Sequence, residues 1–117
     1  MDAVLDDTLF DMVNLPAADT GVTGVVYVST AQGSHGPRVK WFPGRPGRDL
    51  PSLSVTIDVI PRVINHGLPE REARQAGEAV SAWVVLNRTS LISFWNDGLG
   101  WTRTEVNAFF EGLAKLP

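Results

Sequence analysis

The stretch that decides the fold is Leu68–Trp95, LPEREARQAGEAVSAWVVLNRTSLISFW. Pro69 suits a first helical position, because its missing N–H would be unpaired there anyway. Glu70 follows where the positive end of a helix favours a carboxylate. The residues that then recur every three or four positions lie along one side of a helix; they are Ala76, Val80, Trp83, Val84, Asn87, Leu91, Phe94 and Trp95. The pattern predicts a long amphipathic helix that stops at Asn96-Asp97-Gly98.

A straight helix over this stretch would be too long for the domain. At about 1.5 Å per residue it would run about 42 Å, whereas a chain of this length has a radius of gyration of about 13 Å. Asn87, Thr89 and Ser90 also prefer caps to helix interiors. We therefore expect either a bend near Asn87–Ser90 or an end that projects from the domain.

The residues before this helix have the patterns of strands. Val22–Ser29 is rich in β-branched residues, which predicts a mostly buried strand. Arg38–Phe42 alternates basic and apolar residues, so a strand here places Arg38 and Lys40 on one face and Val39 and Trp41 on the other. Ser52–Val59 alternates again, with Leu53, Val55, Ile57 and Val59 on the buried side. Residues 60–64 either extend this strand or form a fourth short one, with Pro61 at an edge or bend.

The two ends of the chain should both be helical. Residues 1–16 predict a short acidic helix that Asp2 caps and that Leu15-Pro16 ends. At about eleven residues it is too short to hold alone, so it docks on the core, docks on a partner, or frays. At the other end, Thr102 followed three residues later by Glu105 predicts a capping box at the start of a closing helix.

Together these elements predict a single α+β domain over residues 1–117. A three- to four-stranded antiparallel meander (22–64) packs against a helical layer (68–116), which holds the long helix and the shorter closing helix, and residues 1–16 form an acidic N-terminal helix or arm. The absence of cysteine excludes disulfides, thiolate catalysis and Cys-based zinc sites. No run approaches the roughly 18 apolar residues of a membrane span. Met1-Asp2-Ala3 lacks the basic flank of a secretion signal, so we expect a cytoplasmic protein that does not enter a membrane.

The net charge of −3 hides a segregation along the chain. Residues 1–20 carry five aspartates and no base, whereas residues 21–66 have a balance of +3. The candidate binding surface is the basic strand and loop, whose residues are Arg38, Lys40, Trp41, Arg45 and Arg48. Basic groups neutralise phosphate and aromatic rings stack on unpaired bases. We expect a small non-catalytic binding or regulatory protein, without cofactor, that recognises nucleic acid or an acidic protein partner. The plainer interpretation is a solvated sheet face and loop, with Trp41 in the core.

The alternative function is a metal-free ribonuclease of the toxin type. His35 and His66 would act as general base and general acid, with Arg38 or Lys40 holding the phosphate. This chemistry requires both imidazoles to reach one phosphate. A metal site from these histidines and Asp49 or Asp58 lacks the usual ligand spacing. A homodimer is also possible through a partly exposed apolar patch, formed by Phe94, Trp95, Leu99 and Trp101.

Three short motifs resemble a small, uncharacterised bacterial domain family. They are His35-Gly36-Pro37-Arg38, then Gly67-Leu68-Pro69, then Trp83, Asn87, Leu91 and Trp95 at four-residue steps. In that family a strand carries a His-x-Pro-type signature and a later helix begins at Gly-Leu-Pro. The resemblance covers Val25 to Asn96, and this chain has Arg38 and Lys40 where the family usually has more histidines. Members are often encoded beside toxin–antitoxin-like genes, so the resemblance implies a small defence or regulatory protein.

Overall fold

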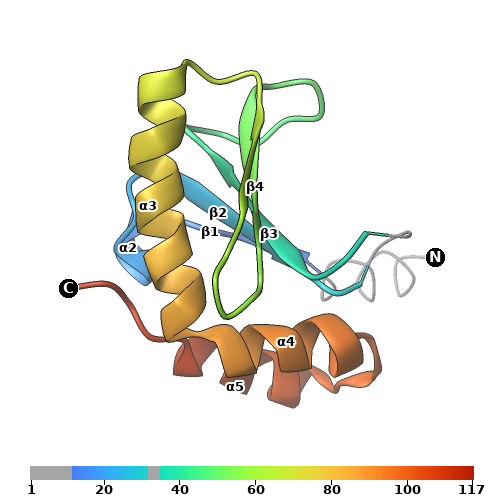
Figure 1. Cartoon of the computed structure of the whole chain (residues 1–117). Coiled ribbons are helices and arrows are strands. Elements are labelled where there is room, and N and C mark those ends of the chain that lie inside the picture. The colour runs from blue at the N-terminus through green and yellow to red at the C-terminus, as the bar shows by residue number, and fades with distance from the viewer. Residues whose placement is uncertain (1–11, 32–34) are drawn as a thin grey trace.

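In the part of the chain that the structure describes, five antiparallel strands form one sheet, and a long helix covers one of its faces (Figure 1). The computed structural model describes residues 12–31 and 35–117. The strands are β1 (Met12–Leu15), β2 (Val25–Ser29), β3 (Arg38–Phe42), β4 (Ser52–Thr56) and β5 (Val63–His66). They lie side by side in chain order, and a four-residue helix, α2 (Ala17–Thr20), joins β1 to β2. The α+β class and the antiparallel meander are therefore confirmed, but the expected count of three or four strands is too low.

The additional strand is β1, which occupies the end of the predicted acidic helix. Met12 pairs with Ser29 and Leu15 pairs with Val26, so both residues belong to the sheet. The prediction of a helix through Leu15 is wrong. A short isolated helix is only marginally stable in water, whereas pairing with β2 gives residues 12–15 backbone hydrogen bonds within a sheet. The rest of the predicted acidic helix, including Asp2, lies outside the described residues.

Of the two alternatives for residues 60–64, the separate short strand is the one that forms, so the segment from Ser52 to His66 holds two strands. β4 ends at Thr56, and β5 returns beside it with Val63 opposite Val55. Val59, which the alternation placed on the buried face, lies in the connecting turn and is 70% exposed. The local alternation continues past Thr56, but the chain reverses before the second strand begins, so Val59 never reaches the sheet.

The long helical stretch bends at Asn87, as its polar residues predicted. α3 (Glu70–Leu86) packs along the sheet, and α4 (Arg88–Asp97) turns away across the ends of the strands (Figure 1). The buried side chain of Asn87 stabilises the bend. Its Nδ2 donates to the carbonyl oxygens of Trp83 and Ala114, both at 3.0 Å, and its Oδ1 accepts from the Ala114 N–H at 2.7 Å.

A short 3₁₀ turn, η1 (Gly98–Gly100), leads from α4 into the closing helix α5 (Arg103–Gly112). The predicted capping box is present, because the Glu105 N–H donates to Thr102 Oγ1 at 3.2 Å and the Thr102 N–H donates to Glu105 Oε1 at 2.8 Å. No helix among the described residues is both long enough and apolar enough to cross a bilayer.

The core lies between α3 and the sheet, and it continues as an aromatic cluster where α4 meets α5. Phe94 is fully buried and stacks on Phe109 with ring centroids 4.6 Å apart. Trp101 packs against both rings, and Trp95 is only 6% exposed. The patch expected to support a homodimer is therefore largely internal. Of its four residues, Leu99 alone is strongly exposed, at 71%.

Candidate anion-binding site on the open face of the sheet

The face of the sheet opposite α3 carries the polar side chains of the central strands. Antiparallel register aligns them in a row, because Tyr27 on β2 lies opposite Lys40 on β3, and Lys40 lies opposite Ser54 on β4. Arg38 is two residues from Lys40 and so faces the same side. No described helix covers the middle of this face (Figure 1). The predicted division of β3, with its two bases on one face and Val39 on the other, is confirmed.

A pocket of about 230 Å³ opens on this face. Its walls come from four strands, from the segment that precedes β3, and from α4. The lining residues are Tyr27, Ser29, His35, Arg38, Lys40, Ser54, His66 and Trp95. Two cationic side chains and two imidazoles therefore line the same pocket, although they lie up to thirty-one positions apart in the sequence, from His35 to His66.

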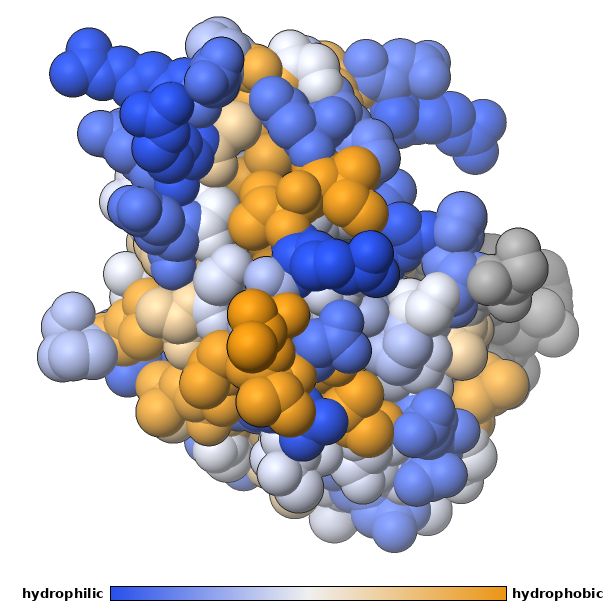
Figure 2. All heavy atoms as spheres, in the orientation of Figure 1, coloured by the Kyte–Doolittle hydropathy of each residue, from blue (hydrophilic) through white to orange (hydrophobic). Residues whose placement is uncertain are grey.

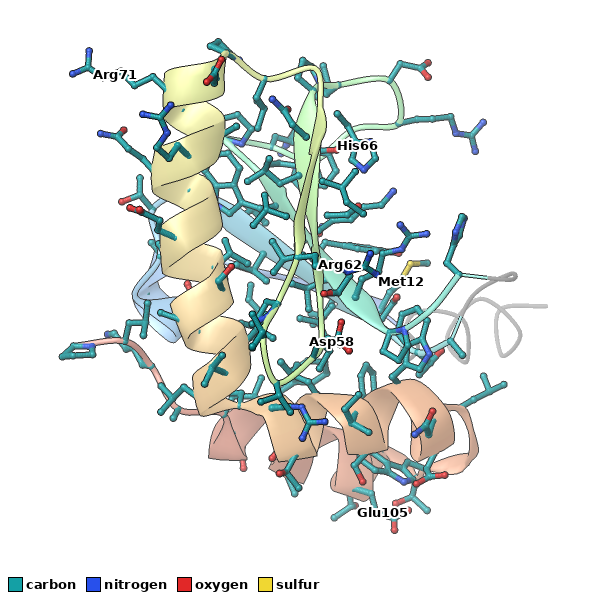
Figure 3. The ribbon with its side chains drawn as sticks, viewed as in Figure 1. Met12, Asp58, Arg62, His66, Arg71 and Glu105 are labelled. Atoms are coloured by element: carbon teal, nitrogen blue, oxygen red, sulfur yellow. The ribbon has the colours of Figure 1, made fainter. Side chains whose placement is uncertain are left out.

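The two histidines, which the sequence places at opposite ends of the strand region, line the same pocket. His66 is the last residue of β5, and its ring points away from the α3 side of the sheet (Figure 3). Its Nε2 lies 2.9 Å from Ser54 Oγ, a hydrogen bond in which either atom can donate, depending on the tautomer. This bond orients the imidazole and leaves Nδ1 as the ring nitrogen available to a ligand.

The charge of the pocket is not neutralised by the described part of the chain. None of the described residues that line it is acidic. On the exposed side of α3, Arg74 forms an ion pair with Glu70 at 3.2 Å, away from the pocket. Arg38 is half-buried and Lys40 is exposed, and neither has a carboxylate partner within residues 12–31 and 35–117. Among the same residues, no three His, Asp or Glu side chains are grouped closely enough to hold a metal ion.

The remaining residues of the predicted binding surface do not line the pocket. Trp41 faces α3, is 4% exposed, and donates from Nε1 to the Thr23 carbonyl at 2.8 Å. It cannot stack on a base, so its proposed binding role is wrong and the plainer interpretation of a core residue is correct. Arg45 and Arg48 are exposed in the loop between β3 and β4. The basic surface therefore has a recessed part, at Arg38 and Lys40, and a separate exposed loop.

Sequence reasoning missed Tyr27, Ser29, Ser54 and Trp95 as pocket residues. Ser54 had a signal, since it alternates with Leu53 and Val55, but its neighbours across the sheet depend on strand register. Tyr27 lies within an apolar run, and such a run does not indicate which face of the sheet each residue occupies. In the structure its hydroxyl donates to Met12 Sδ at 2.8 Å. Trp95 follows the helical pattern of the core, and only the bend at Asn87 brings it to the edge of this pocket.

Comparisons of this chain with protein-family models, with curated proteins and with solved structures found no match. The resemblance to the His-x-Pro family therefore stays a prediction. What the pocket binds has to follow from the chemistry of its own residues.

Proposed function

We propose that the open face of the sheet binds nucleic acid through the phosphate groups of its backbone, with Arg38 and Lys40 as the central cations. The observation that carries this proposal is that both cations line one pocket with His35 and His66, and that none of the described lining residues is a carboxylate. A guanidinium forks onto two phosphate oxygens, and an ammonium contributes a compact positive charge. Imidazole N–H groups add donors that need not be charged.

The size of the pocket favours a small anionic group. Pockets for drug-sized ligands have volumes of about 300–1,000 Å³, so the 230 Å³ here suits a phosphate with its adjoining sugar. Tyr27 is half-buried at the pocket and offers part of an aromatic ring to an unpaired base. A recessed site of this kind favours a phosphate, which is a single compact anion. The carboxylates of an acidic protein surface are distributed over a wider area and suit such a pocket less well. We therefore infer a single-stranded nucleic acid, which presents both a phosphate and an unpaired base.

The test is binding of a fluorescent single-stranded RNA of about 12 nucleotides, measured by anisotropy over a range of salt concentrations. Arg38→Gln with Lys40→Gln should weaken binding about tenfold or more at low salt. The slope of log K against log salt should flatten by roughly 0.7 per charge removed.

The matched control is Arg71→Gln with Arg74→Gln, which removes the same charge from α3, across the sheet from the pocket (Figure 3). This variant should bind as the native protein does. Equal losses in the two double variants, or binding that ignores salt, would contradict the proposal. Stronger competition by an acidic polypeptide than by unlabelled RNA would point to a protein partner instead.

The shared pocket of His35 and His66 supports a second candidate, metal-free RNA cleavage. One imidazole would take the proton of a ribose 2′-hydroxyl as its oxygen attacks phosphorus, and the other would protonate the departing 5′-oxygen. The products are a 2′,3′-cyclic phosphate and a free 5′-hydroxyl, and Arg38 with Lys40 would stabilise the charge on phosphorus. Purified protein should then cleave RNA but not DNA in the presence of EDTA, and His35→Ala or His66→Ala should each stop it. An intact RNA substrate after prolonged incubation would rule this candidate out.

A further inference from the structure

The edge strand β5 is exposed along its whole length, and apolar side chains gather at and beside it. Val63 and Ile64 are 43% and 40% exposed, and Val59 and Ile60 in the preceding turn are 70% and 82% exposed. Figure 2 shows apolar side chains collected over the β4–β5 hairpin and the lower end of α3. An edge strand of this kind presents unpaired backbone groups to any other strand.

The hydrogen bonds of β4 show which backbone groups of β5 face outward. The Thr56 N–H donates to the Arg62 carbonyl, whereas the next residue, Ile57, donates to Pro37 beside β3, both at 3.0 Å. Successive residues of β4 therefore bond alternately to β5 and to β3. Continuing this alternation along the register turns the backbone groups of Ile64 and His66 toward β4. Those of Val63 and Asn65 then point away from the sheet.

The residues that flank β5 restrict how a further strand can pair with it. Pro61 has no N–H to donate, and Gly67 has a φ of +97°, which is not extended. The usable outward groups are thus those of Val63 and Asn65, which lie symmetrically about Ile64. A two-fold dimer interface must be self-complementary, so that residue i of one copy meets residue j of the other and j meets i. The outward groups of Val63 and Asn65 can pair in this way in an antiparallel arrangement.

We propose that two copies of this chain associate through antiparallel pairing of their β5 strands, with the two-fold axis at Ile64. Val63 of one copy would lie opposite the partner's Asn65, and each such pair exchanges two backbone hydrogen bonds. Ile64 meets the partner's Ile64 at the closely spaced, non-hydrogen-bonded position, which buries apolar surface at the centre of the interface. If the axis lay at Val63, Asn65 would face the partner's Pro61, which has no N–H to donate. If the axis lay at Asn65, Val63 would face the partner's Gly67, which is not extended. Either register would therefore lose backbone hydrogen bonds.

The pairing also adds a cation to the candidate site. Arg62 and His66 lie on the same side of β5, away from α3 (Figure 3). In the proposed register the partner's Arg62 is opposite His66, so it reaches the rim of the pocket. The two pockets then share one face of a continuous sheet. This extension of the binding surface rests on the proposed function, whereas the dimer itself does not.

Sedimentation analysis without nucleic acid tests the dimer directly. The native chain should shift from monomer to dimer as its concentration rises. Ile64→Lys should remain a monomer, because it places two ammonium groups directly opposite each other at the axis. Leu99→Lys is the matched control, since Leu99 is also a large exposed apolar residue but lies on η1, and this variant should still dimerise. A native chain that stays monomeric at all concentrations would overturn the proposal, whatever it binds.

A cysteine variant tests the register. The chain has no cysteine, so Ile64→Cys introduces a single thiol. Directly opposite residues of a non-hydrogen-bonded pair have Cα atoms about 4.5 Å apart, and disulfides span about 4.4–6.8 Å. Mild oxidation should therefore convert most of Ile64→Cys into a covalent dimer, while Leu99→Cys and Ile60→Cys should react far more slowly. Equal cross-linking at all three positions would indicate random collisions and would overturn the proposed interface.

Discussion

The two faces of the sheet differ in chemistry although the same strands form both. On the α3 side Val26, Val39, Leu53 and Val55 are at most 1% exposed. On the open side the intervening residues supply the polar groups of the pocket. Because successive side chains of a strand point to opposite faces, each central strand holds the core with one set of residues and builds the candidate site with the other. Stability and binding should therefore respond to different substitutions, even when those substitutions are neighbours in the chain.

The largest expected effect is on the stability of the covered face. Leu53→Ala empties a fully buried position, which typically costs about 2–5 kcal/mol. Urea unfolding followed by circular dichroism should show the loss as a lower midpoint with little change in slope. Leu99→Ala at an exposed position should change the free energy of unfolding by less than about 0.5 kcal/mol. Similar midpoints for the two variants would contradict the assignment of this face as the core.

A smaller effect is expected at Ser54, which is fully buried although it lies on the open face. Ser54→Ala removes the hydrogen bond to His66 and should cost about 1 kcal/mol. The imidazole should also lose its fixed orientation, which ring-proton NMR signals of His66 would report. Ser52→Ala makes the same change at a buried serine that lies directly opposite His66 but forms no side-chain hydrogen bond with the described residues. It should change the His66 ring-proton signals much less than Ser54→Ala does. An equal change in both variants would contradict the role of Ser54 in positioning the imidazole.

The smallest effect on stability is expected for the Arg38→Gln and Lys40→Gln double variant. Neither cation has an ion-pair partner in the described part of the chain, so the free energy of unfolding should change by less than about 0.5 kcal/mol. The same variant should show the large loss of RNA affinity described above. A marked destabilisation would instead make these residues part of the fold, and the separation of the two faces would fail.

The sequence predicted those features that depend on near neighbours in the chain. The capping box at Thr102 and Glu105 follows from residues within one helical turn. Local polar residues also indicated the bend at Asn87, although hydrogen bonds to the distant Ala114 help to stabilise it. The division of β3 into a basic and an apolar face follows from alternation alone. Where two local interpretations were possible, as for Trp41, the sequence named both, and burial against α3 decided between them.

Tertiary structure alone decided the features that join distant segments. Residues 12–15 became a strand because β2 was available to pair with them, and Val59 left the buried face because the chain reversed before β5. The pocket depends on the register of four strands and on the bend that directs Trp95, so no local pattern could place His35 and His66 in the lining of one pocket. Periodicity and capping are set by interactions within a few residues, and they determined which side chains share a face. Strand order and register are set by competition among long-range pairings, and they determined which of those side chains meet.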